Sequence, residues 1–325
     1  MRLYLWFSLM ASMATVHCHA ADITPDIEQR LQELSQQLAI PLPRLQEAVK
    51  ASQHRQSVLD AISRPWEAKP WYQYRQLFVT PGRISNGVRF WQENSVILQQ
   101  AEQRWQVPAA IIVAIIGVET QYGTQMGTHP VLDALYTLGF HYAPRSAYFS
   151  KEFANYVKLA DQENWLLRQP KGSYAGAMGM GQFMPTSYLH FAVDGDDDKH
   201  KDLFSKPADA IHSVAHYFAE HDWKYGAPVA HKAMVQDESR IAHLLGKTLE
   251  LEDSWQTLSR QGVTIATELP STTPVKLLRL DLETGSEYWV LESNFYTITR
   301  YNRSPLYAMA VYQLSEAIAS AYDAK

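Results

Sequence analysis

The stretch "VPAAIIVAIIGVETQYG" places one acid, Glu119, directly after ten uncharged residues, Ala109–Val118. A carboxyl group at the end of a buried helix loses hydration, which raises its pKa and keeps it protonated near neutral pH. A protonated carboxyl is what general acid catalysis requires, so Glu119 is a candidate catalytic acid. Two structural interpretations stay open: Glu119 could reach solvent from the helix end, or it could pair with an arginine.

A glycine-rich stretch, "KGSYAGAMGMGQFMP", forms a second candidate site. Glycine permits close backbone approach and positive φ. The Gly-Lys-Ser/Thr ending of a phosphate-binding loop is absent, so nucleotide binding is not expected. A tight turn would present Ser173, Gln182 and Phe183, which are hydrogen-bonding groups beside an aromatic face and suit a sugar ring with an amide substituent. A close helix–helix crossing filled by methionines is the alternative.

The stretch "DGDDDKHKD", Asp194–Asp202, is a candidate metal site because it has five aspartates in nine positions. Such crowding is unfavourable unless a hard cation neutralises it. Asp194, Asp196 and Asp198 match positions one, three and five of a calcium loop. The match is partial, because the glycine at position six and the glutamate at position twelve are absent. Asp209 could supply the later carboxylate from the following helix, and a solvated acidic loop is the alternative.

Helices are expected to position most of these residues. From Asp26 to Ser63 apolar residues recur at spacings of three and four, which predicts two or three amphipathic helices interrupted at Pro41 and Pro43. Pro108 suits the start of the apolar helix, because its missing N–H does no harm there. Residues 129–223 are expected to be mainly helical.

The composition changes after Gly226. The segments "GVTIATELP", "VKLLRLDLETGSEYWVLES" and "FYTITRYN" are rich in Val, Thr, Ile and Tyr, with turn residues between them. This pattern predicts a small sheet. The final "LYAMAVYQLSEAIASAY" returns to the spacing of an amphipathic helix.

The composition indicates whether the chain can form a sizeable core and which class of partner is not expected. The 325 residues are 46% hydrophobic and 12% aromatic, which is enough for a sizeable core and more than one subdomain. The 29 basic and 34 acidic residues give a formal charge of -5. No overall basic field therefore points to nucleic acid as a partner.

The first residues, "MRLYLWFSLMASMATVHCHA", have the pattern of a secretory signal peptide, with cleavage expected after Ala20. The only cysteine, Cys18, lies inside this segment, so the mature chain would form no disulfide. A lipid-modified Cys18 is the alternative, although "TVHC" lacks the leucine and small residues of a lipoprotein signal. No later apolar run approaches the roughly 20 residues that cross a bilayer. We expect a soluble protein of the periplasm.

Several motifs occur in order between about Trp66 and Val311. They are "GVETQYGTQMGTHPVLDALYTLGF", "YAPRSAYF", "KGSYAGAMGMGQFMPTSY", the aspartate-rich loop followed by "PADAIHSVAHYF", and "NFYTITRYNRSPLYAMAV". Together they resemble the lytic murein transglycosylase B family. The resemblance implies a mainly α (α+β) fold, with a goose-lysozyme-like helical catalytic core, a helical α domain and a small antiparallel β domain.

The resemblance also implies domain boundaries. The signal peptide would span residues 1–20. A helical α domain would span residues 21–105 and be completed by a C-terminal helix at 303–325. The lysozyme-like catalytic core with its calcium loop would span 106–225, and the small β domain 226–302.

The resemblance assigns the role of catalytic glutamate to Glu119. It implies a set of substrate-contacting residues: Ser173, Gln182, Phe183, Tyr74, Arg145, Tyr296 and Tyr301. It implies a set of calcium ligands: Asp194, Asp196, Asp198, the backbone carbonyl of His200, and Asp209. The family's paired arginines appear here as Pro144 and Arg145, so Arg145 would contact a substrate carboxylate alone.

The family cleaves the glycan strands of bacterial peptidoglycan, and the resemblance implies the same activity here without a catalytic cofactor. Glu119 would protonate the leaving oxygen between N-acetylmuramic acid and N-acetylglucosamine. The resulting carboxylate would take the proton of the muramyl C6 hydroxyl, which closes onto C1 and gives a 1,6-anhydro product without consuming water.

Two other functions are the alternatives. A hydrolytic muramidase would need a second carboxylate roughly 5 to 9.5 Å away, and Asp133 is a candidate. A non-catalytic, calcium-dependent cell-wall binding protein would need no acid. In each case peptidoglycan is the expected partner, and the helical lead-in and terminal helix could dock cell-wall synthesis complexes.

Overall fold

A computed structural model of the chain describes residues 22–63, 69–246 and 248–324. The predicted signal peptide and Cys18 lie outside these residues. The mainly helical fold with a small antiparallel sheet is confirmed. Among the described helices, none combines the length and the apolar character needed to span a membrane.

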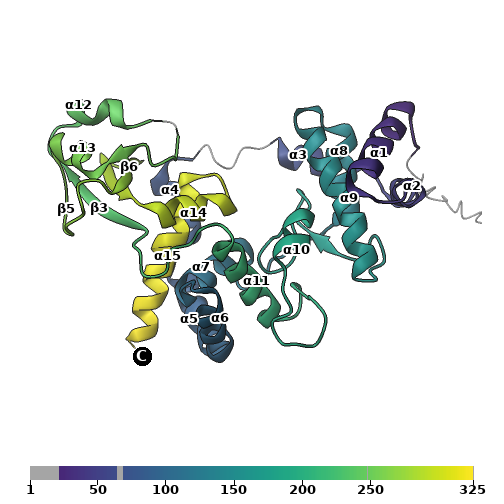
Figure 1. Cartoon of the computed structure of the whole chain (residues 1–325), viewed down its shortest axis with the longest axis horizontal. Helices are drawn as coiled ribbons and strands as arrows, with labels where there is room; N and C mark the ends of the chain where they lie inside the picture. The colour runs from purple at the N-terminus through teal and green to yellow at the C-terminus, as the bar shows by residue number, and fades with distance from the viewer. Residues whose placement is uncertain (1–21, 64–68, 247, 325) are drawn as a thin grey trace, which may run out of the picture.

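The helices form two groups, which contact each other where α10 (Pro185–Phe191) packs on α11 (Pro207–Ala219) (Figure 1). The first group contains α10 together with α1 (Pro25–Leu38), α2 (Leu42–Ala51), α3 (Gln56–Ile62), α8 (Val131–His141) and α9 (Ser146–Gln162). The second contains α11 together with α4 (Trp71–Phe78), α5 (Pro81–Glu93), α6 (Ser95–Trp105), α7 (Ala109–Thr120), α14 (Ser293–Tyr301) and α15 (Pro305–Asp323).

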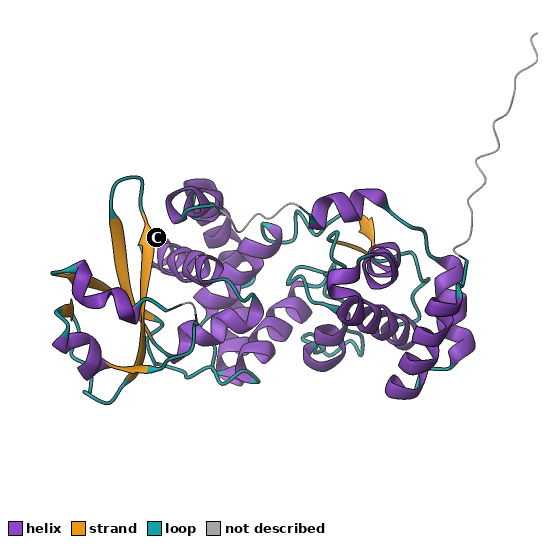
Figure 2. Ribbon diagram, turned by 90° about the horizontal axis from the view of Figure 1, so that it is seen from above, coloured by secondary structure: helices purple, strands orange, loops and turns teal. Residues whose placement is uncertain are grey.

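A five-stranded antiparallel sheet lies at the end of the second group (Figure 2). Its strand order is β4 (Asp253–Ser254), β6 (Pro274–Asp281), β7 (Ser286–Leu291), β3 (Ala230–Val235), β5 (Val263–Ile265). The helices α12 (Glu238–Ile241) and α13 (Trp255–Arg260) lie between these strands in the sequence. A separate small core, which includes Val263, Val275 and Val290, supports the sheet.

The prediction that "FYTITRYN" is a strand is wrong, because this segment forms α14. Its Thr, Ile and aromatic residues favour strands by propensity. However, Phe295, Ile298 and Thr299 are all buried, and their spacing of three and four places them on one helical face. That face can be covered by α15, on which α14 packs. Packing against a neighbouring helix therefore outweighs the local preference.

The contacts group the helices differently from the predicted domain boundaries. The α1 and α2 helices pack on α9, and α3 packs on α8, whereas α15 packs on α4, α5 and α7. The predicted α domain at 21–105 and the predicted core at 106–225 each contribute helices to both groups, and the domain boundaries stay a prediction. Apolar spacing shows that a helix has a buried face, but it does not identify the helix that covers that face. The five strands of the sheet all lie within the predicted β domain, 226–302.

The α7 helix lies at the centre of the second group and packs on α5, α6, α11 and α15. All of its residues except Ala110 and Glu119 are buried. A helix that is apolar on every side is stable only when neighbours surround it. The packing of α7 therefore fixes the position of its C-terminal end, which carries Glu119.

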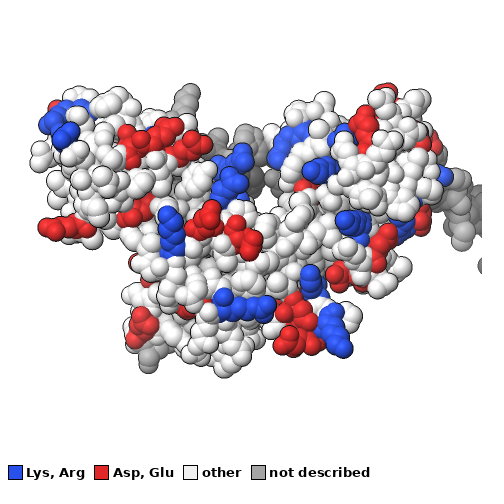
Figure 3. Space-filling model, in the orientation of Figure 1, with Lys and Arg blue, Asp and Glu red and all other residues white. Residues whose placement is uncertain are grey.

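Charged side chains of both signs are interspersed on the face drawn in Figure 3. Acidic and basic atoms lie side by side over the loop between α10 and α11, which contains the aspartate-rich stretch. This face carries no continuous basic surface of the kind that binds nucleic acid.

Candidate active site

Glu119 is next to the last residue of α7, which ends where Gln121 adopts a left-handed backbone with φ of 49°. The Thr120 hydroxyl donates to the carbonyl of Met180 at 2.8 Å and accepts from the N–H of Gly123 at 2.9 Å. These bonds attach the end of α7 to the glycine-rich segment. The two stretches that sequence analysis treated separately therefore meet at Glu119.

Arg83 of α5 holds the same helix end from another side. Its guanidinium donates to the carbonyl of Gly117 at 2.5 Å, and the Tyr122 hydroxyl donates to the carbonyl of Arg83 at 2.8 Å. A cation is favourable at a helix C-terminus, where carbonyls lack intrahelical partners. A Cβ on Gly117 would lie 2.6 Å from the Tyr122 hydroxyl oxygen, so this close packing requires glycine.

The carboxyl of Glu119 accepts a hydrogen bond from the buried hydroxyl of Tyr307, with 2.5 Å between the two oxygens. Glu119 itself is partly exposed. Burial raises the pKa of Glu119 to about 7, although the bond from Tyr307 lowers that pKa in part. A group with this pKa is present in both protonation states near neutral pH, so it can donate a proton and then accept one.

Two tyrosines lie around the Glu119 carboxyl, Tyr307, which is buried, and Tyr301, which is partly exposed. Burial, and then the charge of Glu119, raise the pKa of Tyr301 and of Tyr307 well above the usual range, so both phenols stay neutral. The Tyr301 hydroxyl donates to the carbonyl of Gly181 at 2.5 Å. Tyr74 of α4 also raises the pKa of Tyr307, and so lies near it. The predicted residues Tyr74 and Tyr301 therefore belong to the surroundings of Glu119.

Phe183 and Tyr217 extend this aromatic cluster. The ring centroid of Phe183 lies 6.0 Å from that of Tyr301 and 6.0 Å from that of Tyr217. The Tyr217 and Tyr301 centroids are 4.8 Å apart. The glycine-rich segment thus brings the predicted residue Phe183 to an aromatic wall beside the acid. Phe183 and Tyr217 are buried, so Tyr301, which is partly exposed, is the ring of these three that the apolar face of a sugar could contact.

Gln182 and Ser173 hold the glycine-rich segment in its shape. Gln182 has a positive φ of 50°, and its amide nitrogen donates to the carbonyl of Met126 at 3.2 Å. The Ser173 hydroxyl accepts from the N–H groups of Ala175 at 3.3 Å and Ala177 at 3.1 Å. Both residues are partly exposed. Among the described residues, the amide oxygen of Gln182 and the hydroxyl hydrogen of Ser173 have no hydrogen-bond partner, so both can contact a ligand.

Arg145 and Tyr296 lie in other surroundings. The guanidinium of Arg145 lies over the rings of Tyr148 and Phe149, at 4.5 and 5.0 Å from their centroids. Tyr296 lines a cavity of about 340 Å³ that also includes Arg300. Within the described parts of the chain, neither Arg145 nor Tyr296 hydrogen-bonds to Glu119 or to the glycine-rich segment. Their assignment as substrate contacts remains a prediction.

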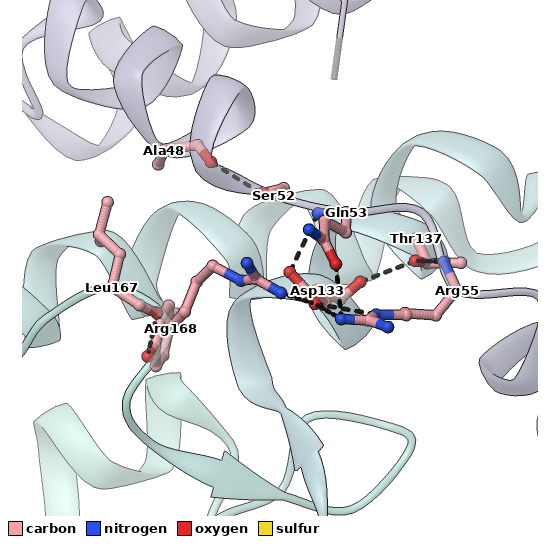
Figure 4. A network of polar contacts seen from close by, with 9 residues as sticks. Ala48, Ser52, Gln53, Arg55, Asp133, Thr137, Leu167 and Arg168 are labelled. Carbon is pink, nitrogen blue, oxygen red and sulfur yellow. Dashed lines mark hydrogen bonds and ion pairs between the residues drawn. The ribbon is translucent and has the colours of Figure 1, made fainter. Parts of the chain in front are cut away.

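Asp133, the candidate second carboxylate, is fully buried in α8 (Figure 4). It accepts from the guanidinium groups of Arg55 at 2.8 Å and Arg168 at 3.0 Å, and from the N–H of Gln53 at 3.0 Å. It therefore connects the chain before α3 to the first helical group. Within the described residues, no other carboxylate contributes to the pKa of Glu119.

Asp194, Asp196 and Asp209 come together as a candidate metal centre, with one carboxylate oxygen of each within 4.8 Å of the others. Asp209 is buried and accepts from the N–H groups of Gly195 at 2.7 Å and Asp202 at 2.6 Å. Burial still raises the pKa of Asp209, and the charges of the other two aspartates raise it further. Three crowded carboxylates, one of them buried, fit a hard divalent cation such as calcium.

The other predicted calcium ligands lie beside this centre. The Asp198 carboxylate accepts from the N–H of His200 at 2.9 Å and lies 3.3 Å from the ammonium of Lys206. Lys206 also pairs with Asp196 at 2.9 Å. Asp198 is not one of the three carboxylates that lie within 4.8 Å of one another. His200 is exposed, and its backbone carbonyl stays a predicted ligand.

Sequence analysis assigned no role to Tyr307, although the segment "LYAMAV" contains it. A tyrosine in the apolar spacing of a buried helix needs a hydrogen-bond partner for its hydroxyl. This requirement could have marked Tyr307 as a residue that contacts another polar group. The partner could not be identified, because Glu119 lies 188 positions away in the chain.

Comparisons with known proteins agree on one family. The model of the transglycosylase SLT domain family matches residues 24–316. The membrane-bound lytic murein transglycosylase B of Escherichia coli K12 is 41% identical over 307 residues, which cover 91% of this chain and 83% of that protein.

Solved structures are similar over most of the chain. Catenated lytic transglycosylase SltB1 of Pseudomonas aeruginosa has a TM-score of 0.86 and 43% identity, covering 92% of this chain and 98% of its own. Escherichia coli lytic transglycosylase Slt35 in complex with calcium has a TM-score of 0.83 and 39% identity, covering 97% and 99%. SltB3 of P. aeruginosa in complex with NAG-anhNAM-pentapeptide has a TM-score of 0.77 and 25% identity, covering 90% and 79%.

Proposed function

The chain belongs to the transglycosylase SLT domain family, and from this premise we propose that it is a lytic transglycosylase that cleaves the glycan strands of peptidoglycan. Its relatives over most of its length are lytic transglycosylases. One observation carries the proposal furthest: a single carboxyl group, Glu119, has a pKa of about 7 and lies beside an aromatic wall and a glycine-rich turn.

In the first step, protonated Glu119 gives its proton to the oxygen that links N-acetylmuramic acid to N-acetylglucosamine. The bond between this oxygen and C1 of the muramyl residue breaks, and positive charge develops at C1. The hydroxyl of Tyr307 stabilises the carboxylate that forms, because hydrogen bonds to a charged acceptor are stronger than bonds to a neutral one.

In the second step, the Glu119 carboxylate takes the proton of the muramyl C6 hydroxyl as its oxygen bonds to C1. The product is a 1,6-anhydromuramoyl end, and Glu119 is protonated again. The same group acts as acid and base, so this reaction needs neither a water nor a second carboxylate.

The surrounding residues would position the sugar. The Ser173 hydroxyl and the Gln182 amide oxygen are placed to bind its polar substituents. Phe183 is buried and would support the partly exposed ring of Tyr301, 6.0 Å away, from behind. Tyr74 and Tyr301 shape the space around the carboxyl. Arg145 and Tyr296 would act further along the strand, and this part of the proposal rests on the family resemblance.

The alternatives have less support. A hydrolytic muramidase would place a second carboxylate near Glu119, yet Asp133 is buried between two arginines. A non-catalytic binding protein would not require a carboxyl group whose pKa is raised to about 7, as that of Glu119 is.

We also propose a structural calcium ion, which Asp194, Asp196 and Asp209 would hold. When bound, it would offset their mutual repulsion and fix the loop between α10 and α11. A structure of the relative Slt35 contains calcium, which supports the choice of ion. Glu119 is not one of the three clustered carboxylates, so we propose a structural role for this ion.

The proposed substrate is a glycan that carries peptides, and the SltB3 complex with a pentapeptide-bearing fragment supports this. We propose the periplasm as the location, from the signal-like pattern of residues 1–20. Docking to cell-wall synthesis complexes through the terminal helices stays a prediction.

Glu119→Gln tests the proposed function. This variant should bind purified peptidoglycan as the wild type does, with cleavage reduced by at least about 1000-fold, because an amide cannot donate the required proton. Glu93→Gln, an exposed substitution on α5, is the matched control and should keep full activity. Undiminished cleavage by Glu119→Gln would remove this residue from the mechanism.

A further inference from the structure

A cavity of about 520 Å³ lies between the chain that follows α9 and the aspartate-rich loop. Two aromatic side chains, Trp165 and Phe204, line it and contact each other edge to face at 5.8 Å. Its other lining residues include Met126, Gly127, Glu163, Lys171, Lys201 and Asp202. None of these is among the residues assigned to the sugar that Glu119 cleaves.

This cavity shares walls with the candidate active site. Met126, which lines it, accepts the hydrogen bond from the amide of Gln182 at 3.2 Å. Lys171, which also lines the cavity, lies two residues before Ser173. The backbones of Gly127 and Gly172 lie in close contact. Gly127 has φ of 96°, and a Cβ there would lie 2.0 Å from the carbonyl oxygen of Gly172. The cavity therefore adjoins the glycine-rich segment of the candidate active site.

Most of the charged side chains that line the cavity have no hydrogen-bond or ion-pair partner among the described residues. Among the described residues, the side chains of Lys171, Lys201 and Glu163 form no hydrogen bond or ion pair, although Lys201 lowers the pKa of Glu163. Asp202 differs, since it accepts from the N–H groups of Phe204 and Ser205. Two unpaired cations and one unpaired carboxylate suit a ligand with charges of both signs, whereas a neutral sugar is usually held by amides and hydroxyls.

We propose that this cavity binds the peptide stem of peptidoglycan, with Lys171 and Lys201 contacting its carboxylates and Glu163 its free amine. Such stems carry several carboxylates and, on a diamino acid, one amine. Trp165 and Phe204 would cover the aliphatic part of that side chain. The inference rests on the proposed function, because a stem is present only if the substrate is peptidoglycan.

The distances allowed by the chain are compatible with this assignment. Met126 lies seven positions after Glu119, and the chain between them turns back on itself: the Gln125 N–H donates to the Thr120 carbonyl at 2.8 Å. Because Thr120 follows Glu119 and Gln125 precedes Met126, the Cα atoms of Glu119 and Met126 lie within about 15 Å of each other. Four extended stem residues reach about 14 Å. A stem attached to the muramyl residue at Glu119 can therefore enter the cavity.

The test compares two substrates: glycan strands that carry stems, and strands from which an amidase has removed them. Lys171→Met should lower the ratio of kcat/KM on stem-bearing over stem-free strands about tenfold, the loss of one charge-assisted hydrogen bond. Lys171→Arg, which keeps the charge, should retain most of the ratio. Lys158→Met removes an exposed lysine of α9 outside the cavity and should leave the ratio unchanged.

An unchanged ratio in Lys171→Met would overturn the proposal, and so would an equal loss on both substrates. A titration of the wild-type protein with free stem tetrapeptide gives a second test that needs no cleavage. The indole N–H signal of Trp165, assigned by its disappearance in Trp165→Phe, should shift with the peptide, and a signal that stays in place would also overturn it. Absence of anhydro products from stem-free strands would instead count against the proposed function.

Discussion

The hydroxyl of Tyr307 lies 2.5 Å from Oε1 of Glu119 and donates a hydrogen bond to it, although the two residues are 188 positions apart in the chain. Tyr307 comes from the first turn of α15, and Glu119 from the last turn of α7, on which α15 packs. Burial and this hydrogen bond act on the acid in opposite directions, and burial has the larger effect.

Tyr307→Phe should weaken catalysis and shift its pH dependence. The hydrogen bond lowers the pKa of Glu119, so its loss should raise that pKa above about 7 and make the group a weaker acid. We expect kcat to fall about 10- to 100-fold, because a bond to a charged group contributes about 1.5 to 3 kcal/mol. The pH at which kcat/KM declines on the alkaline side should move upward, as a pH–rate profile would show.

Tyr312→Phe is the matched control for Tyr307→Phe. It removes another tyrosine hydroxyl from α15, one that donates to the carbonyl of Ala230 at 3.2 Å. This variant should lose a little stability and keep the wild-type pH profile. If kcat/KM of Tyr307→Phe declined at the same alkaline pH as that of the wild type, Tyr307 would have no effect on the pKa of Glu119.

Glu119→Gln should stabilise the protein at alkaline pH. The pKa of Glu119 is raised from 4.5 to about 7, so the native state holds a proton that the unfolded chain has lost between these values. Stability therefore falls as pH rises through this window, by at most about 3 kcal/mol, and partial exposure of Glu119 reduces this cost. Urea unfolding should find the variant more stable than the wild type at pH 8 and nearly equal at pH 4. Equal stability at both pH values would contradict the raised pKa.

Calcium should raise the melting temperature through the three clustered aspartates. With calcium at about a hundredfold excess over Kd, we expect an increase of roughly 5 to 10 °C, which a chelator should reverse. Asp209→Asn should lose most of this response, whereas Asp197→Asn, in the same loop but outside the group of three, should keep it. Turnover at low temperature should change less than the melting temperature. A melting temperature that changes with neither calcium nor chelator would exclude a bound calcium ion.

Asp133→Asn should damage the scaffold and leave the chemistry intact. Arg55 and Arg168 would lose the buried charge they share, at a cost of about 3 kcal/mol in the free energy of unfolding. The folded variant should still release anhydro products at a near wild-type rate. Loss of turnover in protein that remains folded would instead give Asp133 a part in the reaction.

The elements that depend on local pattern could be predicted from sequence. An uncharged run after Pro108 is enough to predict the buried helix that ends at Glu119. The aspartate spacing is enough to bring Asp194 and Asp196 together. The prediction failed for α14. Phe295, Ile298 and Thr299 are residue types that favour strands, but their spacing is that of a helix. Contact with α15 makes the helix favourable.

Features that join distant segments could not be predicted. The pairing of Glu119 with Tyr307 and the attachment of α1 and α2 to α9 depend on which helices cover one another. Asp133 illustrates the same limit. Sequence analysis left it free to approach Glu119, whereas two arginines from separate segments enclose it.

The central claim is that Glu119 alone supplies and recovers the proton, so that no water enters the product. Digestion of purified peptidoglycan in water enriched in heavy oxygen, followed by mass spectrometry of the muropeptides, tests it directly. We expect 1,6-anhydro ends without heavy oxygen, each lighter by one water than a hydrolysed end. Reducing ends that contain heavy oxygen would show that water attacks C1, and would contradict it.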